Sequence, residues 1–217
     1  MNEPVIAIAT HALPEELPVF PLSGVLLLPR GILPLNVFEK RYKSMVDDAL
    51  QTNRLIGMIQ PRQDGATLFS TGCAGKITGF TETEDGRYEI TLKGVCRFTV
   101  AGEMPLNGGL YRRVRPNWSA HYRDTDPATH LNLDRNKLKP LLKTYFDLQG
   151  MDCDWGAVDG ASDDKLITCL AMICPLNAGE KQALLEAACC KTRADLFLTL
   201  LEMAVRDGRE CPDSQCH

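Results

Sequence analysis

Two different spacings of apolar residues divide the chain. Between residues 17 and 118, short apolar runs end at proline, glycine or an Asp-Gly pair, which is typical of β-strands joined by turns. Between residues 133 and 208, apolar residues recur every three or four positions, as on amphipathic helices. The pattern predicts an α+β protein in which a strand-rich part precedes a helical part.

The strand-rich part should hold about six or seven strands and one helix, judged from the usual strand signals. The pair Asp85-Gly86 lies between two β-rich runs and predicts a hairpin. A small barrel or a strongly curled sheet suits this many short strands, because it leaves few exposed edges. The apolar positions of the predicted helix at residues 39–50 share one face: Tyr42, Met45, Val46, Ala49 and Leu50.

Helix-capping and helix-breaking residues mark the expected boundaries in the helical part. Gly150 can end a helix that starts near residue 133, and Pro140 predicts a kink or a division within it. Later boundary signals are Ser162 or Asp163, Pro175, a capping box of Asn177 and Glu180, Thr192 and Gly208. We expect a flexible leader at 1–16, a β-barrel part at 17–118, a linker at 119–132, a helical bundle at 133–208 and a tail at 209–217.

Composition is that of an ordinary globular protein. The chain has 217 residues, of which 44% are hydrophobic and 24% charged. Its net charge of -4 provides no overall attraction to nucleic acid or to an anionic membrane. The first ten residues lack a basic signal-peptide region, and the apolar run LITCLAMICPL is too short to span a bilayer. These features predict a cytoplasmic protein that does not enter membranes.

Nine cysteines with irregular spacing predict reduced thiols rather than a disulfide framework. The tail contains Cys211, Cys216 and His217, which offer three metal ligands where a structural zinc site uses four. We therefore expect neither a metal ion nor another cofactor.

Catalytic motifs are not recognisable in the sequence. It contains no G-x-S-x-G and no H-E-x-x-H pattern. The stretch from Gly72 to Thr78 resembles a phosphate loop, but Ser70 stands where the first glycine is needed. We expect no catalytic residues and no enzymatic activity.

The opening stretch FPLSGVLLLPRGILPLNVFEKRY carries a specific combination of two motifs, Phe20-Pro21-Leu22 and Phe38-Glu39-x-Arg41-Tyr42. It resembles the start of the amino-terminal substrate-binding domain of Lon proteases, and the resemblance covers roughly residues 17–207 by segment assignment. The resemblance implies a PUA-like β-barrel followed by a helical bundle. It also implies a free-standing domain without the ATPase and Ser–Lys peptidase elements of a full Lon.

A non-catalytic polypeptide-binding module is the function that the resemblance implies, with a quality-control adaptor as one form of it. Its partners would be unfolded or client polypeptides or another protein, while the oligomeric state stays open. The alternative is an RNA-binding module of the PUA-like class, which would use Lys76, Arg112, Arg113 and Arg115. The net charge argues against nucleic acid.

Site residues follow from the same stretch. Leu26 and Leu28, with Arg30, are candidates to contact a client if their loop is partly exposed, and burial of both leucines in the core is the alternative. A client would bind in a cleft between the strand-rich and the helical parts. A structural role is expected for the family motif: Phe20, Pro21, Leu22, Phe38, Glu39, Arg41 and Tyr42.

Overall fold

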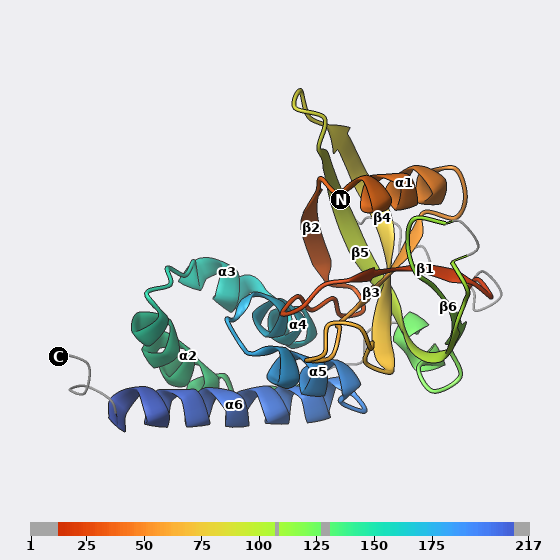
Figure 1. The fold of residues 1–217 in the computed structure, drawn as a ribbon. Coiled ribbons are helices and arrows are strands. Elements are labelled where there is room, and N and C mark those ends of the chain that lie inside the picture. Colours follow the sequence, from red (N-terminus) through yellow and green to blue (C-terminus); the bar gives the residue numbers. More distant parts are fainter. Residues whose placement is uncertain (1–12, 107–108, 127–130, 211–217) are drawn as a thin grey trace.

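The structure, a computed structural model, describes residues 13–106, 109–126 and 131–210. Within these residues it contains one six-stranded sheet and six α-helices, which confirms the predicted α+β class. The strands and the first helix form one side of the molecule, and the other five helices form the opposite side (Figure 1). Most of the expected leader and most of the tail, with Cys211, Cys216 and His217, lie outside the described residues.

The sheet follows the order β2-β5-β4-β3-β1-β6, and β6 pairs with β5 as well as with β1. The pairings therefore run from β5 through β4, β3, β1 and β6 back to β5, while β2 lies outside this ring. All pairings are antiparallel except that of β1 with β3. The strands are β1 (Leu17–Pro21), β2 (Ile32–Val37), β3 (Leu55–Ile59), β4 (Thr71–Glu82), β5 (Tyr88–Glu103) and β6 (Arg113–Asn117).

The predicted hairpin joins β4 to β5. Gly86 adopts a φ of 77°, which glycine reaches without steric penalty. These two strands pair along most of their length, and their hairpin projects away from the helical side (Figure 1). The turn signal was therefore sufficient to place this element.

Helix α1 (Lys40–Leu50) follows β2 and buries four of its five predicted apolar positions, while Leu50 is half-buried. The helical side consists of α2 (Arg135–Gln149), α3 (Trp155–Gly160), α4 (Asp163–Ile173), α5 (Ala178–Glu186) and α6 (Cys190–Glu210). A 3₁₀ helix, η2 (Tyr122–Thr125), lies within the expected linker.

Most predicted helix boundaries agree with the structure. Gly150 is the left-handed C-cap of α2, and Asn177 and Glu180 form a capping box on α5. Three predictions need correction. Pro140 removes one backbone donor but does not divide α2, because Leu138 and Leu142 on either side of it are buried in the core and hold the helix in place. Thr192 lies inside α6, which begins at Cys190, and Gly208 does not end this helix, which runs to Glu210.

Two apolar clusters stabilise the fold. The smaller one fills the ring of strands: Leu17, Val19, Leu55, Ile59, Leu68, Ala74, Phe98 and Val114. The larger one is continuous from α1 and the sheet into α2–α6, and it includes Leu28 from the loop after β1 and Leu138 from α2. The strand-rich and helical parts therefore share one core.

Candidate functional site

The predicted client-contact leucines lie in this shared core. Leu26 is 2% exposed and Leu28 is 0% exposed, so the expectation of a partly exposed loop is wrong. The physical reason is close backbone contact with β5, because the N–H of Arg30 donates to the carbonyl of Gly94 at 2.8 Å. A Cβ on Gly94 would lie 2.0 Å from the carbonyl oxygen of Leu28, so glycine lets the loop lie flat on the sheet.

Arg30 remains exposed and has a φ of 67°. Its guanidinium donates to the carbonyl oxygen of Asp126 at 2.5 Å, just after η2. The structure thus separates Arg30 from the two leucines with which the sequence grouped it.

Most family-motif residues lie in positions that suit packing. The rings of Phe20 and Tyr42 stack with centroids 4.1 Å apart, and Arg41 pairs with Glu39 at 2.8 Å. Pro21 and Leu22 are half-buried at the end of β1. Their structural role remains a prediction.

Phe38 departs from this group, because its side chain is 67% exposed at the corner between β2 and α1. It has the largest exposed fraction among the large apolar side chains of the described residues. Packing in the core does not explain this phenylalanine.

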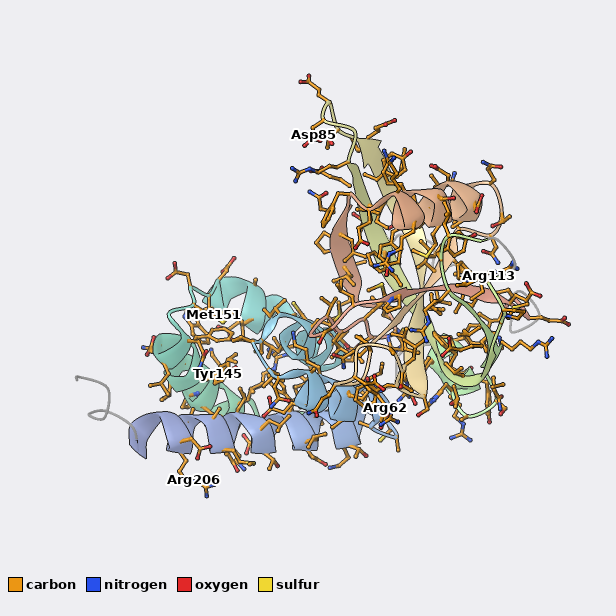
Figure 2. All side chains as sticks on the ribbon, viewed as in Figure 1. Arg62, Asp85, Arg113, Tyr145, Met151 and Arg206 are labelled. Atoms are coloured by element: carbon orange, nitrogen blue, oxygen red, sulfur yellow. The ribbon has the colours of Figure 1, made fainter. Side chains whose placement is uncertain are left out.

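The part of the sheet beside β2 is a three-stranded flap, which we define as residues 32–37, 76–82 and 88–93 of β2, β4 and β5. Asp85 at the tip of its hairpin lies far from helices α2–α6 (Figure 2). One face of the flap packs in the large core with α1, where Lys43 Nζ lies 4.4 Å from the centre of the Tyr88 ring. The opposite face, here called the open face, is directed to solvent.

Strand register assigns the open face three rows of side chains. Residues directly opposite each other in antiparallel strands point to the same side of the sheet. The rows are Ile32, Lys93 and Lys76; then Pro34, Thr91 and Gly79; then Asn36, Glu89 and Thr81. Along the face, the character changes from apolar and cationic, through small, to polar and acidic.

A hollow of about 490 Å³ lies across the flap, lined by residues 34–36, 79–81 and 89–91. Gly79 contributes no side chain, and a Cβ there would approach Thr91 Cβ and Oγ1 at 3.3 Å. Glycine at this position therefore leaves the middle row of the open face without a large projecting side chain. Beside it, Ile32 is 55% exposed.

The outer edge of β2 pairs with no other strand of the described residues. Unpaired edges can accept an added strand, but natural proteins often limit such pairing with proline. Pro34 in the centre of β2 lacks an N–H and has this effect. A bound segment would thus depend largely on side-chain contacts with the open face.

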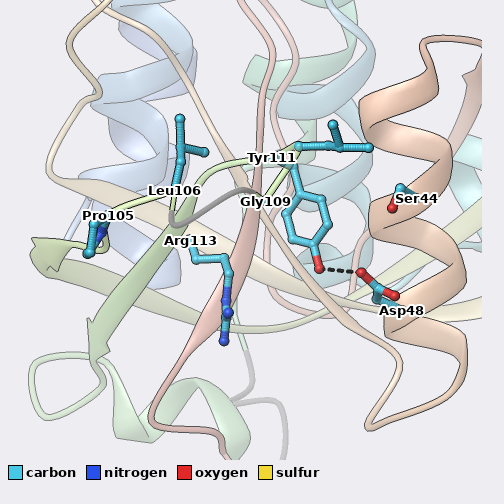
Figure 3. A pocket seen from close by; sticks show the side chains of 8 residues that line it. Ser44, Asp48, Pro105, Leu106, Gly109, Tyr111 and Arg113 are labelled. Atoms are coloured by element: carbon cyan, nitrogen blue, oxygen red, sulfur yellow. Dashed lines mark hydrogen bonds between the residues drawn. The ribbon is translucent and has the colours of Figure 1, made fainter.

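A second hollow, of about 310 Å³, lies between α1 and residues 105, 106, 109–111 and 113. The Tyr111 hydroxyl points at Asp48 and donates to its carboxylate at 2.7 Å (Figure 3). Burial and this hydrogen bond raise the pKa of Tyr111 to about 12. Both hollows are lined by the strand-rich part alone, so neither is the predicted cleft between the two parts.

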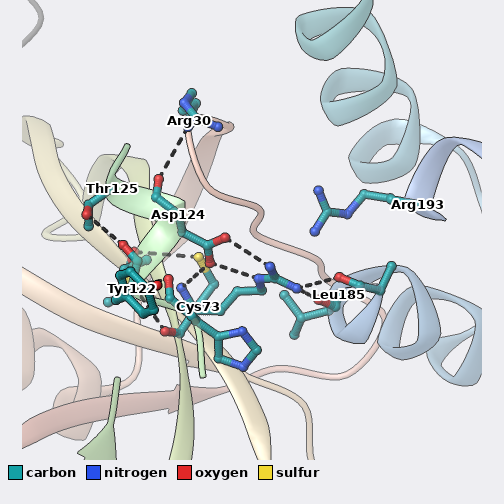
Figure 4. A network of polar contacts seen from close by, with 12 residues as sticks. Arg30, Cys73, Tyr122, Asp124, Thr125, Leu185 and Arg193 are labelled. Carbon is teal, nitrogen blue, oxygen red and sulfur yellow. Dashed lines mark hydrogen bonds and ion pairs between the residues drawn. The ribbon is translucent and has the colours of Figure 1, made fainter. Parts of the chain in front are cut away.

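At the junction where that cleft was expected, buried polar groups connect the two parts. Arg97 of β5 forms a two-point ion pair with Asp124, at 2.8 and 2.9 Å, and donates to the carbonyl oxygens of Leu185 and Ala187 (Figure 4). Arg193 of α6 points toward this group and donates to the carbonyl oxygen of Leu184 at 2.8 Å. Two guanidinium groups thus bind the carboxyl end of α5, where positive charge is favourable.

Comparison with known proteins assigns the family. A family model described as the ATP-dependent protease La (LON) substrate-binding domain matches residues 16–203. The chain belongs to this family. Lon protease 2 of Myxococcus xanthus is 27% identical over 197 residues, covering 87% of this chain and 24% of the relative. Lon protease of Anaeromyxobacter dehalogenans is 25% identical over 206 residues, covering 91% and 24%.

Solved structures of the Lon amino-terminal region have the same fold. A Lon N-terminal domain protein from Xanthomonas campestris gives a TM-score of 0.60 at 24% identity, covering 85% of this chain and 97% of that one. The N-terminal domain of Mycobacterium avium complex Lon protease gives 0.60 at 18% identity, covering 88% and 98%. This chain spans about a quarter of the length of the first Lon relatives, and its match is to the substrate-binding domain alone.

Basic residues of this Lon-family domain do not form one free patch. Arg112 binds Glu103 through two nitrogens at 3.1 and 2.7 Å, and Arg113 pairs with Glu16. Lys76 lies apart from them, on the open face of the flap. The basic residues proposed to bind RNA therefore do not lie together, and the charges of Arg112 and Arg113 are neutralised by carboxylates.

Other candidate chemistry is sparse in the part of the chain that the structure describes. It contains no cluster of three or more His, Cys, Asp or Glu side chains able to hold a metal ion. No described helix is long and apolar enough to cross a membrane. The open face was not predicted from the sequence. Gly79 was a usable signal for it, because a glycine inside a strand pattern often marks a bulge or a close approach.

Proposed function

We propose that this chain is a non-catalytic polypeptide-binding module whose contact surface is the open face of the flap. We also infer that the ring of strands is a PUA-like barrel and that α2–α6 form its helical bundle. The observation that carries the proposal is an exposed apolar edge, with Ile32 at 55% and Phe38 at 67%, beside a hollow in a Lon substrate-binding domain. The two side chains lie at opposite ends of β2, about 20 Å apart at the usual rise of a strand, and exposed apolar side chains of this kind often mark contact surfaces.

Burial of apolar side chains would drive the association. Complete burial of an isoleucine or phenylalanine side chain contributes about 1.5–3 kcal/mol. Ile32 and Phe38 are each more than half exposed, so about 1–2 kcal/mol per residue is available. Several such contacts support weak, reversible binding of extended apolar segments, which suits a domain that engages unfolded chains or acts as a quality-control adaptor.

RNA binding is the weaker proposal. Arg112 and Arg113 already have carboxylate partners, and the flap carries acidic residues near its tip, including Glu89. Phosphate groups would be repelled there. Peptide-bond hydrolysis is not proposed, because the family match includes only the substrate-binding domain.

Substitution of one exposed isoleucine tests the proposal. Ile32→Ser on the flap and Ile173→Ser at the end of α4 alter side chains of nearly equal exposure, 55% and 54%. Binding of a fluorescent, permanently unfolded protein is measured by anisotropy. We expect the Kd of Ile32→Ser to be 5- to 10-fold higher than that of the unaltered chain, which corresponds to a loss of about 1–1.4 kcal/mol in binding free energy. The Kd of Ile173→Ser should be unchanged. Equal affinities of both variants and the unaltered chain would exclude the flap as the contact surface.

A further inference from the structure

Two lysines lie directly opposite each other on the open face. Lys76 of β4 pairs in register with Lys93 of β5, and both have solvent-accessible side chains. Like charges at directly opposite positions of a sheet are destabilising. Among the described residues, neither ammonium group lies within ion-pair distance of a carboxylate. The fold therefore retains a local repulsion that it does not neutralise.

The surroundings of this pair are those of a contact surface. Ile32 completes the same row, 55% exposed, and the next row contains only Pro34, Thr91 and Gly79. The next carboxylate on the open face is that of Glu89, four residues along β5 from Lys93, or about 13 Å at the usual rise of a strand. An extended segment lying over the hollow would span this distance with four or five residues.

Charge complementarity defines what such a segment should carry. We propose that Lys76 and Lys93 together bind a carboxylate side chain that flanks an apolar stretch of an extended polypeptide. Ile32 contacts the adjoining apolar side chain, and the hollow at Gly79 receives the next one. A carboxylate between two ammonium groups gains charge-assisted hydrogen bonds and removes their mutual repulsion. The inference deepens the proposed function and rests on it.

A nucleic acid would fit this surface less well than a polypeptide. Its phosphates repeat along the whole strand, so those beyond the lysine row would lie against Glu89. A single flanking carboxylate avoids that repulsion. The surface thus favours a polypeptide with an acidic residue at one end of its apolar run.

Three peptides test the inference on the full chain. They share one apolar centre, have blocked termini, and differ only in a single flanking Glu, Gln or Lys. We expect the Kd for the Glu peptide to be about 5- to 10-fold lower than for the Gln peptide, with the Lys peptide weakest. The preference should decrease with added salt, because the contact is exposed.

Charge variants complete the test. Lys76→Gln with Lys93→Gln should abolish the preference, and Lys76→Glu with Lys93→Glu should invert it. The matched control, Lys143→Glu with Lys165→Glu on α2 and α4, should retain it. Lys93→Glu alone creates an opposite-charge pair with Lys76, so we expect an unchanged or higher Tm together with weaker binding of the Glu peptide.

The outcomes separate this inference from the proposed function. Equal affinity for all three peptides overturns the role of the lysines and leaves the apolar surface in place. Failure of every peptide and of the unfolded protein to bind overturns the proposed function itself. A single-stranded oligonucleotide that displaces the Glu peptide and loses affinity in the Gln double variant would identify the row as a phosphate site and overturn the inference.

Discussion

Two regions of the molecule contain similar residue types in different surroundings. One is the junction between the strand-rich and helical parts, and the other is the flap. At the junction, Leu28 is fully buried and Arg97 has a carboxylate partner. On the flap, Ile32 is half exposed and Lys93 faces another lysine. Groups that stabilise the fold are covered and paired, whereas groups available for binding remain uncovered and unpaired. This contrast is the reason why we propose the contact surface on the flap and not at the junction.

The largest expected effect is at Leu28. Leu28→Ser should lower the free energy of unfolding by about 3–5 kcal/mol, because it combines a cavity with a buried hydroxyl. Ile32→Ser should change it by less than about 0.5 kcal/mol, as is usual for surface substitutions. Urea denaturation of both variants measures this difference. Similar losses at the two positions would invalidate the comparison.

The next largest effect concerns the ion pair at the junction. Arg97→Met should destabilise the protein by about 3–5 kcal/mol, because it leaves the Asp124 carboxylate buried without its partner. Lys137→Met is the control, since the pair of Lys137 with Glu202 is about half exposed and should contribute less than about 1 kcal/mol. Thermal and urea unfolding measure both. A loss below 1 kcal/mol for Arg97→Met would show that this pair does not hold the parts together.

The ion pair of Arg97 with Asp124 also predicts that the stability of the fold falls in acid. Burial acts to raise the pKa of Asp124, but hydrogen bonds and charge from Arg97 outweigh it and lower this pKa below its ordinary value. The stabilisation is therefore present above about pH 4, the range of an unfolded aspartate, and is lost as the pH falls through the lower pKa of the folded state. Unfolding measured from pH 6 to pH 2 should show a steeper acid loss for the unaltered protein than for Asp124→Asn. Parallel curves would contradict this assignment.

A smaller effect on stability is expected where the loop that contains Leu28 packs on β5. Gly94→Ala places a Cβ 2.0 Å from the carbonyl oxygen of Leu28, so the loop must shift and stability should fall by about 1–3 kcal/mol. Gly102→Ala in the same strand meets no atom within 4 Å and serves as the control. If both variants unfold at the same urea concentration as the unaltered protein, close contact with β5 is not what buries Leu26 and Leu28.

The sequence was sufficient for elements with strong local signals. Gly86 placed the hairpin, Asn177 and Glu180 placed the start of α5, and the spacing of Tyr42 and Met45 placed α1. These features depend on residues close together in the chain. The family motif then indicated the fold class without any knowledge of strand pairing.

The proposed contact surface could not be predicted in the same way, because it depends on register between distant strands. Lys76 and Lys93 are 17 positions apart and become neighbours only through a bulged pairing of β4 with β5. The burial of Leu26 and Leu28 likewise depends on Gly94, more than 60 residues later. A run of leucines followed by Pro29 and Arg30 looks like an exposed loop until this contact is known.

Amide hydrogen exchange with and without an unfolded client tests the central claim most directly. We predict slower exchange in residues 32–38 and 79–91 when the client is present. Peptides that cover residues 22–30 and the junction helix α5 should exchange equally in both states. Protection confined to α2–α6 or to residues 105–113, with an unchanged flap, would contradict the assignment of the open face as the binding surface.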